Sequence, residues 1–234
     1  MKLLVSPINK EEAIIASRGG ADIVDVKNPK EGSLGANFPW IIRDIKEAVN
    51  GRQPISATIG DFNYKPGTAS LAAFGAAVAG ADYIKVGLYD IQTPAQALEL
   101  LINITRAVKE YDSTKKVVVS GYSDYKRINS ISPLLLPAVA AKAGADVVMV
   151  DTAIKDGKST FEFMDEKELK KFTDLAHEYG LENAIAGSLK FDDLPMLERI
   201  GPDIIGVRGM VCGGDRRTAI QQELVEKLVA ECQA

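Results

Sequence analysis

The chain has 234 residues, of which 46% are hydrophobic, and its formal net charge is −4. This length fits one large domain or two small ones, and the hydrophobic fraction is ample for a core. Because charges of both signs are interspersed, the composition gives no electrostatic reason to expect nucleic acid or a membrane as a partner.

A repeat organises the chain from the first residues onward. Gly-Ala-Asp occurs at 20–22, 80–82 and 144–146, and Gly-Pro-Asp at 201–203, each followed by two residues typical of a strand. The intervals of about 60 residues are long enough for two strand–helix units. Four further strands are predicted at 3–6, 55–60, 117–120 and 184–187. Helical patterns fill the gaps, at 10–18, 39–49, 68–79, 94–111, 131–142, 165–179, 191–200 and 218–231.

Eight strands therefore alternate with eight helices, an order typical of a parallel sheet. Because no linker or composition shift divides the chain, we predict a single α/β domain over residues 1–234, folded as a (β/α)8 TIM barrel. A doubly wound open sheet is the alternative. It is disfavoured by the regular repeat, and because Ser-Pro-Ile-Asn at 6–9 stands where that fold would carry a Gly-x-Gly-x-x-Gly turn.

The strand that follows the first repeat carries two charged residues. Side chains alternate along a strand, so Ile23, Asp25 and Lys27 share one face. Pro29 comes just after them and ends the strand, which places Lys27 at its carboxyl end. Buried charges are costly unless they are paired or take part in chemistry, so this strand predicts a functional site.

The repeat also allows residues on different strands to be compared by depth. The second residue of each repeat, at 21, 81, 145 or 202, serves as the reference. Six residues after it lie Lys27, Gly87, Asp151 and Arg208, and four residues after it lie Asp25, Lys85, Met149 and Gly206. Continued alternation after Asp151 brings Lys155 to the same side. Barrel active sites are built at the carboxyl ends of the strands. The sequence therefore predicts a cluster of lysines, aspartates and one arginine over one barrel mouth.

Two interpretations of this cluster are open. The charges can simply close the upper layer of the barrel with ion pairs, or they can depress the pKa of one amine and make it a nucleophile. The only histidine, His177, lies in a predicted helix, so a Ser-His-Asp triad or a histidine metal site cannot be built. Cys212 has no histidine base and is expected to be a packed thiol. Amine and carboxylate chemistry remains.

Two glycine-rich stretches follow the last two predicted strands. In barrels the loops after strands seven and eight commonly bind phosphate, because backbone N–H groups converge there. Glycines also serve simple turns. We predict that a small phosphorylated carbonyl compound is held by its phosphate at Gly187, Ser188, Arg208, Gly209, Gly213 and Gly214, while its carbonyl meets an amine.

Residues 20–36, 83–87, 151–157 and 208–216 carry a resemblance that extends over essentially the whole chain. They resemble the archaeal (5-formylfuran-3-yl)methyl phosphate synthases, also called 4-(hydroxymethyl)-2-furancarboxaldehyde-phosphate synthases. The resemblance implies a lyase of methanofuran biosynthesis that joins two molecules of glyceraldehyde 3-phosphate. It matches Lys27 to the Schiff-base lysine, Lys85 to the proton acceptor, and Asp25, Asp151 and Lys155 to supporting charged residues.

Three functions are compatible with these features of the sequence. The first is the furan-forming lyase, the second another Schiff-base aldolase or a phosphosugar isomerase on the same barrel, and the third a barrel that binds a metabolite without catalysis. The expected partner is a small phosphorylated triose. No motif for a metal, nicotinamide or flavin is present, so no cofactor is expected, and a homo-oligomer is expected.

The remaining features concern the compartment. The apolar run after Met1 is too short for a signal peptide, and no apolar stretch reaches the roughly 18 residues of a membrane span. Cys212 and Cys232 are the only cysteines, too few for a disulfide framework in a chain of this size. We expect a cytoplasmic protein.

Overall fold

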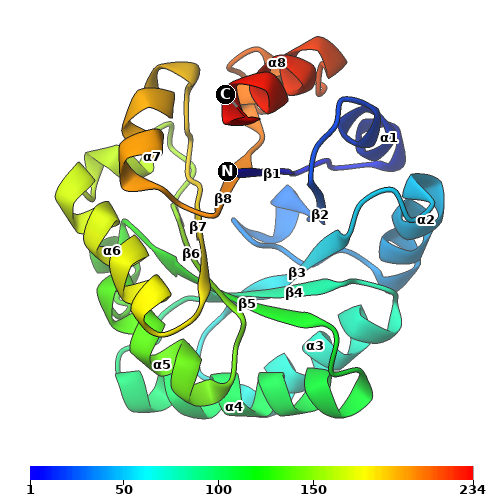
Figure 1. Ribbon diagram of the computed structural model, residues 1–234. Helices are drawn as coiled ribbons and strands as arrows, with labels where there is room; N and C mark the ends of the chain where they lie inside the picture. The colour runs from blue at the N-terminus through cyan, green and yellow to red at the C-terminus, as the bar shows by residue number, and fades with distance from the viewer. Residues whose placement is uncertain (234) are drawn as a thin grey trace.

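Eight parallel strands close into a barrel in the computed structural model, which describes residues 1–233 (Figure 1). Each strand pairs with the next in chain order, and the last pairs with the first. The strands are β1 (Lys2–Val5), β2 (Ile23–Val26), β3 (Ile55–Phe62), β4 (Tyr83–Leu88), β5 (Lys116–Tyr122), β6 (Val147–Asp151), β7 (Glu182–Ile185) and β8 (Ile204–Val207). The predicted (β/α)8 barrel is confirmed, and closure of the ring excludes the open-sheet alternative.

A helix follows each strand and packs on the outside of the barrel (Figure 1). The helices are α1 (Lys10–Arg18), α2 (Pro39–Val49), α3 (Pro66–Val78), α4 (Pro94–Tyr111), α5 (Leu136–Ala143), α6 (Glu166–Glu178), α7 (Leu194–Ile200) and α8 (Gln222–Gln233). Three of them, α1, α2 and α4, have the predicted bounds. Among residues 1–233, none of the helices combines the length and the apolar composition that a membrane crossing requires.

Two strands and one helix differ from the prediction in a way that affects the site. β3 and β5 run two residues further than predicted, so that Asp61 and Tyr122 belong to them. α8 begins at Gln222 and not at Thr218, because the Thr218 hydroxyl donates to the carbonyls of Cys212 and Asp215, at 2.7 and 2.9 Å, and closes a turn. Loops and strand ends near the mouth are therefore less regular than the repeat suggests.

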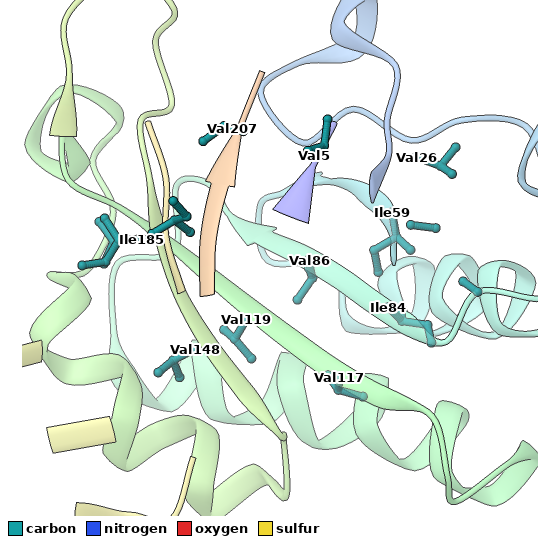
Figure 2. Close-up of a cluster of buried hydrophobic side chains, with 14 of the residues drawn as sticks. Val5, Val26, Ile59, Ile84, Val86, Val117, Val119, Val148, Ile185 and Val207 are labelled. Carbon is teal, nitrogen blue, oxygen red and sulfur yellow. The ribbon is translucent and has the colours of Figure 1, made fainter. Parts of the chain in front are cut away.

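Apolar side chains fill two layers of the fold. The larger layer lies between the strands and the helices and includes Val86 and Val119 (Figure 2). The smaller layer fills the inside of the barrel, and it consists of Leu4, Ile23, Val118, Val147, Met149, Ala184, Ala186 and Ile204. Because Ile23 lies inside the barrel, alternation along β2 turns Asp25 inward as well. The predicted inward face of β2 is confirmed.

The aspartate of each repeat is tied to the strand before it, at the amino end of the barrel. The Oδ2 atoms of Asp22, Asp82, Asp146 and Asp203 accept the N–H groups of Leu3, Ile55, Val117 and Asn183, at 2.7, 2.7, 2.7 and 2.9 Å. Each bond joins an odd-numbered strand to the next even-numbered one. We call these four contacts the aspartate latches. They explain the repeat as a structural feature at the end of the barrel opposite the predicted chemistry.

Candidate active site

A cavity of about 1340 Å³ opens where the carboxyl ends of the strands meet. All but one of the predicted site residues line it, namely Lys27, Lys85, Asp151, Lys155, Gly187, Ser188, Arg208, Gly209, Gly213 and Gly214. The exception, Asp25, pairs with Lys85 inside the barrel, and its side chain is fully buried. The structure thus brings the lysine cluster and the glycine-rich loops to one mouth.

Lys85 on β4 and Asp25 on β2 form a buried ion pair. Lys85 Nζ donates to Asp25 Oδ2 at 2.8 Å, and Ser6 Oγ donates to the same oxygen at 2.9 Å. The other oxygen, Oδ1, has no hydrogen-bond partner within residues 1–233. Burial by itself raises the pKa of Asp25, but the charges of Lys85 and Lys27 outweigh it and leave this pKa lowered. The carboxylate therefore stays ionised and keeps one free acceptor.

Lys27 differs from Lys85 in its partners. The residue is 7% exposed and lines the cavity. No carboxylate oxygen in the described part of the chain lies within 4.0 Å of its Nζ. Burial lowers the pKa of Lys27 to about 8, the charge of Asp151 opposing this and that of Lys155 assisting it. An amine with such a pKa is partly unprotonated near neutral pH, as a nucleophile must be.

Asp151 ends β6 and pairs with Lys155. Lys155 Nζ donates to Asp151 Oδ1 at 2.5 Å and to Thr152 Oγ1 at 3.0 Å. Burial raises the pKa of Asp151, but the charges of Lys155 and Lys27 outweigh burial and lower it to about 2. The expectation that strand alternation continues to Lys155 is wrong, because β6 ends at Asp151. A turn brings Lys155 back to the same mouth.

The loops after β7 and β8 leave backbone N–H groups unpaired beside the cavity. The N–H groups of 187–189 and of 209–210 donate to no acceptor within residues 1–233. Ser188 has φ of 55°, a left-handed conformation uncommon for serine, and such strain is often found at binding sites. We call residues 187–189 and 209–210 the loop cradle. Unpaired N–H groups that converge beside a cavity suit an anion.

The N–H groups of Gly213 and Gly214, which were predicted to contact phosphate, are bonded within the protein. Both of their N–H groups donate to the carbonyl of Gly209, so they close a turn in the loop after β8. Their φ angles of 70° and 96° explain why glycine stands there. Leu189 and Met210, whose N–H groups are unpaired, were not predicted as phosphate-binding residues. A backbone donor leaves no signal in the side-chain type.

Arg208 is paired within the protein. Its guanidinium donates to both oxygens of Glu12 at 2.7 and 3.3 Å, and to the carbonyls of Ser6, Arg216 and Thr218 at 3.0, 2.8 and 3.1 Å. A guanidinium has five N–H donors, and all five are used here. In this arrangement Arg208 has no donor left for a phosphate. It holds the loop after β8 against α1 and β1.

The loop between β2 and α2, residues 28–37, forms one wall of the cavity. Pro29, Gly32 and Ser33 contribute to this wall. Ser33 Oγ donates to the carbonyl of Thr152 at 2.9 Å, which ties the loop to the residue after Asp151. The sequence did not mark Ser33 as a site residue, because a serine in a glycine-containing loop is typical of any turn.

The other possible nucleophile and base lie away from this centre. Cys212 is buried, and burial raises the pKa of its thiol, as expected for a packed cysteine. The ring of His177 is exposed near the end of α6, with Nε2 3.0 Å from Asp203 Oδ2 at the amino end of the barrel. Neither residue lines the cavity.

Comparison with known proteins shows the family of the chain. A family model described as 4-HFC-P synthase matches residues 3–229. The chain belongs to the 4-HFC-P synthase family. Relatives named (5-formylfuran-3-yl)methyl phosphate synthase include the protein of Methanosarcina barkeri, 90% identical with 100% of both chains covered, that of Archaeoglobus fulgidus, 59% identical with 98% of both covered, and that of Methanocaldococcus jannaschii, 56% identical with 99% and 100% covered. The resemblance seen in the sequence is confirmed.

Solved structures from outside this family share the fold. 3-Hexulose-6-phosphate synthase has a TM-score of 0.68 at 20% identity, with 99% of both chains covered. Phosphoribosyl anthranilate isomerase from Thermus thermophilus has a TM-score of 0.63 at 16% identity, with 100% of this chain and 98% of the other covered. At such identities the likeness concerns the barrel alone.

Proposed function

We propose that the protein condenses two molecules of glyceraldehyde 3-phosphate into (5-formylfuran-3-yl)methyl phosphate, as a carbon–oxygen lyase of methanofuran biosynthesis. Two trioses that lose one phosphate and two waters have the atoms of this product. The family of the chain and the names of its relatives support the overall reaction. The observation that carries the mechanism is Lys27, a buried amine without an ion-pair partner in residues 1–233, at the mouth of the cavity.

In the proposed reaction the free amine of Lys27 attacks the carbonyl of one triose and forms an imine with loss of water. The protonated imine withdraws electrons and acidifies the neighbouring C–H bond. The negative charge of Asp151, which acts on Lys27, favours this cation. Water is taken up again at the end, when the imine is hydrolysed and frees the amine.

Lys85 and Asp25 are the proposed proton carriers. Asp25 Oδ1 has unused lone pairs, and Oδ2 holds Lys85 Nζ at 2.8 Å, so a proton can be exchanged within the pair. Removal of the C–H proton gives an enamine that attacks the aldehyde of the second triose. Elimination of phosphate and ring closure need further proton transfers, for which Lys155 and Asp151 lie at the same mouth.

The loop cradle is the proposed phosphate site. Its unpaired N–H groups suit a phosphate dianion, and it lines the same cavity as Lys27. The cavity of about 1340 Å³ exceeds the roughly 300–1,000 Å³ typical for one drug-sized ligand, so two trioses have room.

Incubation with glyceraldehyde 3-phosphate tests this proposal. A furan aldehyde is conjugated and absorbs in the near ultraviolet, whereas an aldol or an isomerised triose does not. We expect growing absorbance, a product mass equal to two trioses minus one phosphate and two waters, and a borohydride-dependent adduct that peptide mapping places on Lys27. An adduct without the absorbing product would instead indicate a simple aldolase, and an adduct on another lysine would reassign the nucleophile.

A further inference from the structure

A second buried polar pair lies beside the lysine cluster and takes part in no step above. Tyr122, at the end of β5, donates its hydroxyl hydrogen bond to Oδ1 of Asp61 on β3. The other carboxylate oxygen, Oδ2, accepts the N–H of Leu34 at 3.2 Å. Tyr122 is fully buried and Asp61 is partly buried. One carboxylate therefore connects the barrel wall to the loop of residues 28–37.

Leu34 is the anchor of that loop. Its side chain is fully buried and packs in a cluster with Tyr122 and Ile128. The next residue is fixed as well, because Thr58 Oγ1 donates to the carbonyl of Gly35 at 2.6 Å. The loop is therefore held by the apolar packing of Leu34 and by hydrogen bonds at residues 34 and 35.

Glycines make room for the pair on two sides. Gly87 on β4 stands at the depth that Lys27 occupies on β2, and a Cβ there would collide with the Tyr122 hydroxyl and lie 2.7 Å from Asp61 Oδ1. A Cβ on Gly32 would collide with Asp61 Oδ2. Since Gly87 does not have a positive φ, space alone requires glycine at this position. A glycine of the barrel wall and a glycine of the loop therefore both leave space for the Asp61 carboxylate.

Burial of Asp61 and Tyr122 is costly, and hydrogen bonds compensate for it. Burial raises the pKa of Asp61, against the hydrogen bonds from Tyr122 and Leu34, and burial followed by the charge of Asp61 raises the pKa of Tyr122 well above its usual value. The phenol therefore remains a donor. A buried carboxylate persists only where donors satisfy it, and here both oxygens are bonded.

We propose that Asp61 and Tyr122 are positioning residues that hold the loop of residues 28–37 closed over Lys27. The loop starts directly after Lys27, and Asn37 Nδ2 donates back to the Lys27 carbonyl at 3.4 Å. Closure keeps water from the amine and maintains the desolvation on which its reactivity depends. The effect on the amine rests on the proposed imine at Lys27, whereas the effect on the loop does not.

Tyr122→Phe removes one oxygen and keeps the ring that packs on Leu34. In this variant we expect the backbone amides of residues 32–36 to exchange hydrogen about tenfold faster or more. Adduct formation at Lys27, trapped with borohydride in the presence of glyceraldehyde 3-phosphate, should slow by a similar factor. The kcat should fall with little change in KM, because the loop cradle is built from the loops after β7 and β8 and not from residues 28–37.

Gly87→Ala displaces the same pair without altering any of its atoms, so it should produce the same changes. Tyr83→Phe is the matched control, since it removes a hydroxyl near the amino end of β4, and it should change neither loop exchange nor trapping. Thermal unfolding of all three variants checks that the barrel remains folded.

The effect of the pair on the loop and its effect on Lys27 can be tested separately. If the amide hydrogen exchange of residues 32–36 is unchanged in both Tyr122→Phe and Gly87→Ala, Asp61 and Tyr122 do not hold the loop. Faster exchange with unchanged trapping and kcat overturns the role toward Lys27. If the unmodified protein forms no adduct, the proposed function fails and so does the role toward Lys27, while the exchange rates still decide whether the pair holds the loop.

Discussion

Lys85 and Asp25 meet across the inside of the barrel, with Nζ and Oδ2 2.8 Å apart and side chains 1% and 0% exposed. Their strands, β4 and β2, are not neighbours, since β3 lies between them. Lys27 follows Asp25 by two residues and has no carboxylate at this distance within residues 1–233. One carboxylate therefore distinguishes the two lysines: Lys85 is held by it, and Lys27 remains available.

Substitution of the two lysines by arginine should have different effects. In Lys27→Arg we expect neither turnover nor a borohydride-dependent adduct, because a guanidinium stays protonated and has no free amine. In Lys85→Arg turnover should stop while the adduct at Lys27 still forms, because a proton carrier is lost after the imine step. Mass spectrometry of the reduced protein with peptide mapping measures both. A fully active Lys27→Arg would show that Lys27 serves only as a charge in the upper layer.

The pH dependence of the reaction should report on Lys27. The amine is protonated and unreactive below its pKa and free above it, so kcat/KM should rise with pH through a midpoint near 8. Lys155→Met should move that midpoint upward, because it removes a positive charge that lowers the pKa and leaves the negative charge of Asp151, which raises it. A midpoint that does not respond to Lys155→Met would indicate that another group limits the rate.

A negative charge in the loop cradle should weaken substrate binding. Ser188 lines the cavity, and Ser188→Asp introduces a carboxylate where an anion is proposed to bind. Ser188→Asn is the matched control, because asparagine has nearly the same shape and tolerates the left-handed φ of 55°. We expect the KM for glyceraldehyde 3-phosphate to be about tenfold or more higher in the Asp variant than in the Asn variant. Equal KM values would place the phosphate elsewhere.

The buried Glu12–Arg208 ion pair should contribute strongly to stability. Both side chains are 5% exposed, so Glu12→Gln leaves a buried guanidinium without its counter-charge. We expect a loss of roughly 3 kcal/mol in the free energy of unfolding, measured by urea denaturation. Glu166→Gln breaks the exposed pair with Arg199 and should have little effect. Similar losses in both variants would contradict the structural role given to Arg208.

The barrel and its lysine cluster could be predicted because their signals lie in side-chain types at regular spacing. The repeat set the depth of the even strands, and alternation then placed Asp25, Lys27 and Lys85 inside. The predicted strand ends at 60 and 120 were too early, since glycine and serine more often belong to turns than to strands. β3 continues instead past an irregular register between Thr58 and Asp61.

The side-chain contacts that could not be predicted join segments that lie far apart in the sequence. Asp61 and Tyr122 are 61 residues apart and meet only because the barrel brings β3 and β5 together over Gly87. Arg208 was predicted to face a phosphate, yet Glu12, 196 residues away, takes its guanidinium. Spacing along the chain can show at what depth a residue lies, but which neighbour it bonds depends on loop geometry.

The aspartate latches divide the chain in a way that the closed ring conceals. Each latch joins β1 to β2, β3 to β4, β5 to β6 or β7 to β8, so the repeating unit is two strands and the helices that follow them. The chain can be separated into these quarters at the connections after α2, α4 and α6 without splitting a latch. Hence the hydrogen bonds of the latches stay within a quarter, whereas the bonds at the lysine-bearing end, such as Lys85–Asp25 and Arg208–Glu12, pass from one quarter to another.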